Sequence, residues 1–249
     1  GASDFVVISA DDIGAVQVTK MIQDKKIISF GVSNHADLKI GSLDASGPKV
    51  KFSLSYEDQS AEAVLKIPGE HNAQNAAGAV AVLLGLGFDL AESLAAVASF
   101  GGTDRRFQLH GDRRGVSVYD DFAHHPTEVA AALLAAKASV GEGRLITVFQ
   151  PHLYSRTRIF YKEFAEALKI SDFSLVTSIY AAREDPEPGV TAELITNAAT
   201  EAPGIRLVSN WDDVPAAAAA IAMPGDFIIT MGCGDIYKMV PALLDALDT

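Results

Sequence analysis

The chain has 249 residues, a formal net charge of −12 and one cysteine, Cys233. A chain of this length buries roughly 70–75% of its unfolded surface without a disulfide or metal, and a lone cysteine fits a reducing cytoplasm. The negative net charge argues against general nucleic-acid binding. The sequence has no long apolar run and no secretory signal pattern, so we expect neither a membrane span nor export.

The first hundred residues predict an α/β region that contains a small antiparallel sheet. Strands are expected at residues 5–9 and 26–32, and helices are expected at 12–23, 72–84 and 90–99. Residues 36–67 alternate in polarity between Asp, Gly and Ser turns, which is typical of antiparallel strands. The Gly-rich stretch 100–104 predicts a hinge between a first domain, residues 1–106, and a second, residues 107–249.

Beyond this hinge, predicted strands and helices alternate regularly. The strands are expected at residues 116–119, 145–149, 173–178, 205–208 and 227–231. The helices are expected at residues 127–138, 159–168, 192–199, 214–222 and 237–247. This alternation predicts right-handed β-α-β units on a parallel sheet, and so a Rossmann-like second domain.

Two polar clusters directly follow predicted strands. Residues 119–128 read Tyr-Asp-Asp-Phe-Ala-His-His-Pro-Thr-Glu, and residues 149–158 read Phe-Gln-Pro-His-Leu-Tyr-Ser-Arg-Thr-Arg. Ligands of open α/β sheets bind beyond the carboxyl ends of strands, so these side chains predict a site for an anionic substrate. Arg156 can engage a carboxylate bidentately, and a helix N-terminus adds a favourable field. The alternative is that the Asp and His residues of the first cluster only cap a helix that begins near Pro126.

Three further patterns bear on nucleotide binding. Asn72 and Asn75 share a helix face, and an Asn amide matches the donor and acceptor edge of adenine, although an N-cap is the alternative for Asn. Gly-Cys-Gly at 232–234 predicts a tight turn between strand and helix, with Cys233 as a packed side chain rather than a nucleophile. No Gly-x-x-x-x-Gly-Lys-Ser/Thr sequence occurs, so the chain contains no P-loop.

These motifs together resemble the Mur ligases of peptidoglycan synthesis, and among them the alanine-adding members. The resemblance is carried, in family order, by residues 69–77, 103–107, 119–128, 149–158 and 232–236. Mur ligases have three domains. The resemblance implies that this chain is the end of the central ATPase domain followed by the complete C-terminal domain, within a longer protein.

The resemblance also implies an activity and roles for individual residues. Such a ligase uses ATP and Mg²⁺ to convert the carboxylate of UDP-N-acetylmuramate into an acyl phosphate, which the amine of L-alanine attacks. No residue of this chain is assigned as a metal ligand, because the Mg²⁺ ligands are expected upstream. The nucleotide is expected to contact His71, Asn72, Asn75, Arg106 and Asp121. The amino-acid side is expected to comprise His124, His125, His152 and Arg156.

Two other functions stay open from the residues alone. Asp120, Asp121, His124 and His152 are of types that bind transition metals, so a metal-dependent hydrolase is one alternative. A non-catalytic nucleotide-binding or interaction module is the other.

Overall fold

The computed structural model describes residues 3–249, and the chain divides into two compact units, Gly1–Gly102 and Thr103–Thr249. The division falls after Gly102, whereas the sequence placed the domain boundary after Arg106. The intervening segment bonds to the second unit. Arg105 pairs with Asp120, and Phe107 donates its backbone N–H to Asp121.

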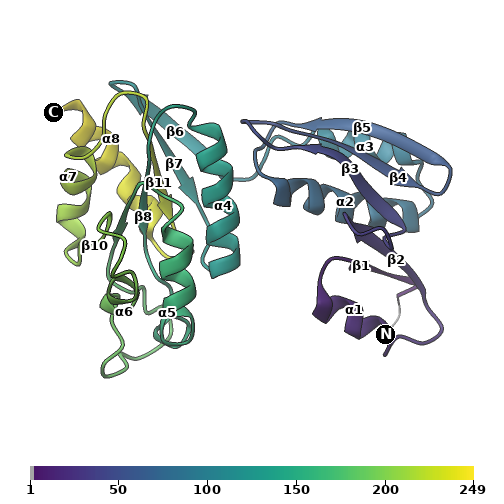
Figure 1. Ribbon diagram of the computed structural model, residues 1–249, viewed down its shortest axis with the longest axis horizontal. Coiled ribbons are helices and arrows are strands. Elements are labelled where there is room, and N and C mark those ends of the chain that lie inside the picture. The colour runs from purple at the N-terminus through teal and green to yellow at the C-terminus, as the bar shows by residue number, and fades with distance from the viewer. Residues whose placement is uncertain (1–2) are drawn as a thin grey trace. The chain divides into compact units, whose positions relative to one another are not determined.

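The first unit contains a five-stranded sheet whose strands lie in sequence order (Figure 1). Its strands are β1 (Phe5–Ser9), β2 (Lys26–Gly31), β3 (Leu38–Asp44), β4 (Val50–Tyr56) and β5 (Gln59–Leu65). The first three strands run parallel, while β4 and β5 continue the sheet antiparallel. The expected antiparallel strands between residues 36 and 67 are therefore present.

Three helices accompany this sheet, namely α1 (Ile13–Thr19), α2 (Glu70–Gly85) and α3 (Leu90–Ala98). Helix α2 buries a face of small residues, including Ala73 and Ala77, which lets its backbone approach the sheet closely. Helix α1 buries none of its side chains and ends at Thr19, before the predicted end at residue 23.

The second unit contains a six-stranded sheet in the order β10-β9-β8-β11-β7-β6. Its strands are β6 (Gln108–Arg113), β7 (Val116–Asp121), β8 (Leu145–Phe149), β9 (Phe173–Val176), β10 (Ile205–Leu207) and β11 (Phe227–Met231). All neighbours run parallel except the edge strand β6, which pairs antiparallel with β7. The parallel strands were predicted and β6 was not.

Helices cover both faces of this sheet (Figure 1). The helices are α4 (Pro126–Ser139), α5 (Tyr154–Leu168), α6 (Glu193–Ala198), α7 (Val214–Ala219) and α8 (Val240–Asp248), with 3-10 turns η1 (Trp211–Asp213) and η2 (Ile236–Met239). Leu145 and Phe149 of β8 pack into the core with α4, α5 and α6, while Ile146 and Val148 pack into the core with α7 and α8. Because both faces are covered, β8 is apolar on both sides, as expected for a central parallel strand.

The starts of α5 and α8 differ most from their predicted positions. Helix α5 begins at Tyr154 rather than at residue 159, and it contains a kink at Phe160. The helix predicted at 237–247 is divided into η2 and α8, with a proline in the first turn of α8. No helix within residues 3–249 is long and apolar enough to cross a bilayer.

Candidate active site

Three loops meet at the C-terminal ends of neighbouring strands in the second unit. Strand β11 lies between β7 and β8, and its last residue, Met231, is in register with Asp121 and with Phe149. The loops that follow these three residues therefore begin side by side. This is the edge of the sheet at which the sequence predicts the site.

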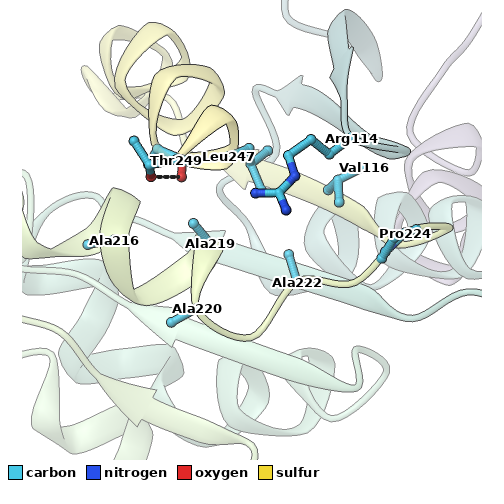
Figure 2. A pocket seen from close by; sticks show the side chains of 10 residues that line it. Arg114, Val116, Ala216, Ala219, Ala220, Ala222, Pro224, Leu247 and Thr249 are labelled. Atoms are coloured by element: carbon cyan, nitrogen blue, oxygen red, sulfur yellow. Dashed lines mark hydrogen bonds between the residues drawn. The ribbon is translucent and has the colours of Figure 1, made fainter.

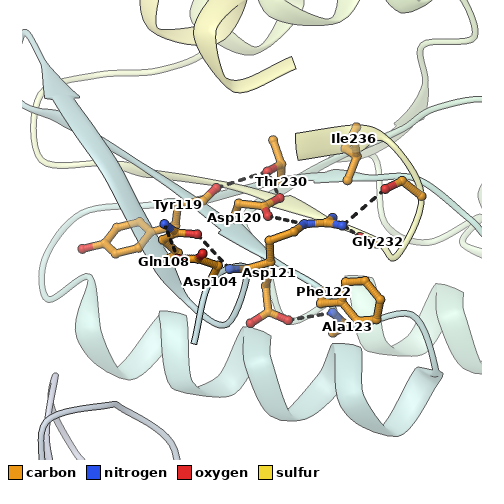
Figure 3. A network of polar contacts seen from close by, with 12 residues as sticks. Asp104, Gln108, Tyr119, Asp120, Asp121, Phe122, Ala123, Thr230, Gly232 and Ile236 are labelled. Atoms are coloured by element: carbon orange, nitrogen blue, oxygen red, sulfur yellow. Dashed lines mark hydrogen bonds and ion pairs between the residues drawn. The ribbon is translucent and has the colours of Figure 1, made fainter. Parts of the chain in front are cut away.

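A buried ion pair lies beneath these loops. Asp120 is fully buried at the end of β7, and its Oδ2 lies 2.9 Å from Nε of Arg105. Its Oδ1 accepts a hydrogen bond of 2.6 Å from the hydroxyl of Thr230 on β11 (Figure 3). Both oxygens of Asp120 are thus engaged, and a charge in the interior is compensated by a charged partner.

The same arginine ties the loops together. Arg105 also donates to the carbonyl oxygens of Gly232, at 2.6 Å, and of Gly234, at 3.3 Å. Its guanidinium lies 5.0 Å from the ring centroid of Phe122 and 4.4 Å from that of Tyr237. Through these contacts Arg105 holds the loops after β7 and β11 in place.

Asp121, predicted to contact the nucleotide, fixes the chain around itself. It is 5% exposed, and its two oxygens accept the backbone N–H groups of Ala123, at 2.7 Å (Figure 3), and of Phe107, at 2.9 Å. Burial raises the pKa of Asp121, against the lowering effect of these two bonds and of the nearby Arg106. Arg106 itself is exposed, with its guanidinium carbon 5.6 Å from the Phe122 ring centroid. The nucleotide roles of Asp121 and Arg106 stay predictions.

His125 caps helix α4. Its Nδ1 accepts the N–H of Thr127 at 3.4 Å, while Glu128 reaches back to the N–H of His125 at 3.3 Å, which completes a capping box. Pro126 occupies the first turn, as predicted. The ring of His125 meets Phe160 edge-on at 5.0 Å. His125 therefore has a structural task, and its predicted contact with the amino acid stays a prediction.

The ring of His124 is oriented by two acceptors. Its Nδ1 lies 3.0 Å from the carbonyl oxygen of Phe122 and 3.3 Å from Oε2 of Glu128. Because neither oxygen can donate, Nδ1 carries the hydrogen, and Nε2 of the neutral ring keeps its lone pair. Within residues 3–249 no side chain or backbone group bonds to that Nε2.

His152 has the opposite arrangement. Its Nδ1 lies 3.2 Å from Nη1 of Arg156, which can only donate, so Nδ1 is the acceptor and Nε2 carries the hydrogen. Burial, followed by the charge of Arg156, lowers the pKa of His152, which favours the neutral ring. The ring stacks on Tyr180 at 5.8 Å and meets His124 edge-on at 6.1 Å. The structure therefore brings His124, His152 and Arg156 together, as the sequence led us to expect.

Helix α5 presents Arg156 in its first turn, yet it has no capping side chain of its own. Its N-cap residue, Leu153, has a left-handed φ of 72°, and the cap is supplied from the loop after β9. There Glu184 accepts the backbone N–H of Ser155 at 3.0 Å and also its hydroxyl. Tyr180 accepts the N–H of Leu153 at 2.9 Å. The sequence analysis assigned no role to this loop, because no distinctive motif marks it.

The turn at 232–234 packs tightly, as predicted. A Cβ added to Gly234 would lie 2.5 Å from Oε1 of Gln150 and 2.7 Å from Cγ of Tyr180, so only glycine fits there. Cys233 is half-buried between these glycines, with its thiol beside the Arg156 side chain. Burial raises the pKa of Cys233, so the group is a neutral thiol, consistent with a packed side chain.

In the first unit, the predicted adenine contacts lie at the start of α2. Gly69 is the N-cap, so the alternative of an Asn N-cap is wrong. Asn72 donates to the carbonyl of Pro68 at 2.7 Å, and Asn75 donates to Oδ1 of Asn72 at 3.3 Å, which confirms their shared face. Asn75 is exposed, and His71 lies half-buried in the same first turn. Their contact with a nucleotide stays a prediction.

Comparison with known families is decisive. The family described as the Mur ligase, glutamate ligase domain matches residues 105–234, and the Mur ligase middle domain matches residues 1–83. The chain belongs to the Mur ligase family. The strand-end site thus lies within the glutamate ligase domain match, and the start of α2 lies within the middle domain match.

Individual Mur ligases show how far the similarity extends. The chain is 49% identical over 248 residues to UDP-N-acetylmuramate–L-alanine ligase of Clavibacter michiganensis subsp. michiganensis, covering 99% of this chain and 52% of that protein. A structure of UDP-N-acetylmuramate-alanine ligase MurC from Thermotoga maritima has a TM-score of 0.75 at 25% identity, covering 97% of this chain and 51% of that one. A MurF ligase from Thermotoga maritima in complex with ADP, at 17% identity and a TM-score of 0.71 over 99% of this chain and 54% of that one, shows the shared fold. This chain spans about half the length of the relatives it matches.

The geometry of this Mur ligase gives no support to the hydrolase alternative. Within residues 3–249 no group of three His, Cys, Asp or Glu side chains is placed to hold a metal ion. Asp120 and Asp121, which that alternative requires as ligands, have their oxygens engaged by Arg105, Thr230 and backbone N–H groups.

Figure 2 shows a pocket of this Mur ligase, which has a volume of about 410 Å³ and is lined by none of the predicted site residues. It is lined by residues around α7, α8 and the start of β7, namely Arg114, Val116, Ala216, Ala219, Ala220, Ala222, Pro224, Ala246, Leu247 and Thr249. Val116 begins β7 and Asp121 ends it, so the pocket and the predicted site lie toward opposite ends of that strand. Most lining side chains are apolar and small, so this pocket lacks the converging polar groups of the site.

Proposed function

We propose that the chain is part of an ATP-dependent ligase that joins L-alanine to UDP-N-acetylmuramate through an acyl phosphate. The observation that carries this proposal is the 49% identity to a UDP-N-acetylmuramate–L-alanine ligase along 99% of the chain. Phosphorylation activates the muramate carboxylate toward attack by the amine. Phosphate is a good leaving group, whereas a free carboxylate would have to expel an oxide ion. We expect the reaction to take place in the cytoplasm, where ATP is available.

The second unit would hold the incoming amino acid. Arg156 and the Nε2–H of His152 are donors, and they lie within one hydrogen-bonded pair. Two donors, one of them permanently charged, suit a carboxylate, and the start of α5 adds the favourable field of a helix N-terminus. Cys233 beside Arg156 and the stacked rings of His152 and Tyr180 form a compact surface there, suited to a small side chain such as a methyl group.

We propose nucleotide contacts for residues of each unit separately. We assign ATP to the exposed amide of Asn75, with His71 and Asn72 beside it, and to Arg106 and Asp121. Mg²⁺ would neutralise phosphate oxygens during the transfer. We expect the ligands of this ion mainly in other parts of the protein, as the resemblance to Mur ligases implies.

The test uses the full-length protein and measures phosphate release that depends on ATP, UDP-N-acetylmuramate and L-alanine together. Arg156→Lys should raise the KM for L-alanine about 10- to 100-fold, because a charge-assisted hydrogen bond contributes about 1.5–3 kcal/mol, and should leave the KM for ATP unchanged. Arg158→Lys is the matched control, since Arg158 is exposed and pairs with Glu187.

The 249-residue chain alone should form no product, because it contains no P-loop. Ligation by this chain alone would contradict the assignment. So would full-length protein that forms product from a different amino acid while ignoring L-alanine.

A further inference from the structure

The two histidines that face each other at the site have opposite hydrogen-bonding states. His152 accepts from Arg156 at Nδ1 and presents a hydrogen at Nε2. His124 donates from Nδ1 to the carbonyl of Phe122 and toward Glu128, and presents a lone pair at Nε2. The neutral tautomer of each ring is therefore set by its neighbours, and the two rings can perform different tasks.

We propose that His124 is the general base that takes a proton from the ammonium group of the incoming amino acid, and that Glu128 is the positioning residue that orients it. The inference rests on the proposed function, and it adds the route of the proton. An ammonium group has no lone pair and cannot attack an acyl phosphate. Transfer of one proton from that group to Nε2 of His124 gives a neutral amine and an imidazolium ring.

The remaining steps then balance without another reactant. The amine nitrogen forms a bond to the acyl carbon, and the bond from that carbon to the phosphate oxygen breaks. The second proton lost by nitrogen leaves with phosphate as hydrogen phosphate, and His124 returns its proton to solvent. The carboxylate of Glu128, 3.3 Å from Nδ1 of His124, stabilises the imidazolium while it exists.

The other candidates at this edge of the sheet are occupied. His125 accepts the N–H of Thr127 at Nδ1 and so, like His152, carries its hydrogen at Nε2. Cys233 is a neutral thiol whose pKa is raised by burial, and the oxygens of Asp120 lie bonded beneath the loops. Among the histidines of the two polar clusters, His124 is the one whose unprotonated ring nitrogen accepts no hydrogen bond from residues 3–249.

Glu128 is held in the orientation that this role needs. Its Oε2 accepts the backbone N–H groups of His124, at 3.2 Å, and His125, at 3.3 Å. Although partial burial opposes it, the bond from the His124 N–H and the proximity of the His124 ring lower the pKa of Glu128, so the carboxylate stays charged. The side chain of Glu128 thus both completes the capping box of α4 and orients His124.

The test separates proton removal from every earlier step. In the full-length ligase, His124→Gln should lower kcat with L-alanine about 10²- to 10⁴-fold near neutral pH, the usual contribution of a general base. Hydroxylamine, which is uncharged at neutral pH, should still trap the acyl phosphate as a hydroxamate at close to the wild-type rate. Retained trapping also proves that the variant is folded.

Glu128→Gln gives an independent reading, because Gln preserves the capping box but removes the charge. Its kcat should fall about tenfold, because the imidazolium that forms during the reaction has lost its anionic partner. His110→Gln, on the exposed edge strand β6, is the matched control and should behave as wild type.

Two outcomes would overturn the inference. One is an equal loss of hydroxamate and alanine product in His124→Gln, and the other is unchanged alanine ligation in that variant. Failure of the proposed function looks different, because the wild-type enzyme would then form no alanine product and the His124 variants would not be informative.

Discussion

At the scale of single residues, a buried ion pair organises the candidate site. Arg105 and Asp120 are 19% and 0% exposed at their side chains, and their ion pair joins the start of the second unit to the end of β7. A buried pair of this kind contributes little net stability, yet removal of one partner leaves an uncompensated charge. Its task is to fix the loops that carry the functional groups.

His152 provides a prediction about pH. Burial first, and the charge of Arg156 second, lower its pKa, so its NMR titration midpoint in the 249-residue chain should lie below the ordinary value of about 6.5. In the unfolded chain the ring takes up a proton at higher pH than in the folded chain. This group therefore lowers the stability of the fold as pH falls below about 6.5.

Arg156→Met should move the His152 midpoint back toward the ordinary value, whereas Arg158→Met, a change on the same helix to an arginine that pairs with Glu187, should leave it in place. An identical midpoint in wild type and Arg156→Met would show that the two side chains do not interact in solution.

The limits of prediction are also clearest at this scale. The polar clusters directly follow apolar strands, so their convergence at one edge of the sheet could be predicted from spacing alone. Which ring nitrogen of each histidine carries the hydrogen could not be predicted from the sequence. It depends on the Phe122 carbonyl for His124 and on the Arg156 guanidinium for His152, and those contacts follow from backbone geometry.

At the scale of elements, helix α5 depends on a distant loop. Leu153 offers no capping side chain, and Glu184 supplies the cap through Ser155. Sequence reasoning begins this helix at residue 159 because no Ser, Thr, Asp or Asn stands just before Tyr154. The residue that caps this helix, Glu184, lies in another loop, and rules based on neighbouring residues cannot identify it.

Glu184→Gln should accelerate hydrogen exchange of the backbone amides in the first turn of α5, because the charged acceptor for the Ser155 N–H is lost. Glu187→Gln is the matched control on the same loop, since Glu187 pairs with the exposed Arg158. Hydrogen–deuterium exchange with mass spectrometry measures the exchange of these amides in both variants. Unchanged exchange around Ser155 in Glu184→Gln would show that the cap is dispensable.

Strand β6 was missed for a different reason. None of its side chains is fully buried, and Gly111 and a shift in register interrupt its alternation. The apolar runs of β8 and β11 were predicted because both faces of these strands are covered. Burial on two sides leaves a clear pattern in sequence, and an exposed edge strand does not.

At the scale of the whole molecule, the chain contains separate cores. One core joins α2 and α3 to the first sheet, and two others lie on the two faces of the second sheet. Each unit therefore has apolar packing of its own. We expect residues 103–249 to fold and to unfold cooperatively without the first unit.

The position of the boundary can be tested by stability. A protein of residues 107–249 lacks Arg105 and leaves Asp120 buried without its charged partner, so it should be about 3–5 kcal/mol less stable than residues 103–249. Denaturant unfolding of the two proteins measures this difference. Equal stability would place the functional start of the domain after Arg106, where the sequence analysis put it.

The strand order has a consequence for synthesis on the ribosome. Strand β11 lies between β7 and β8 in the sheet, yet it is translated after both of them. A nascent chain that has emerged only as far as Gly225 holds two strands whose shared neighbour does not yet exist. Thr230, Gly232 and Gly234, which hold Asp120 and Arg105, arrive with β11, so the edge that carries the candidate site forms only when this strand joins the sheet.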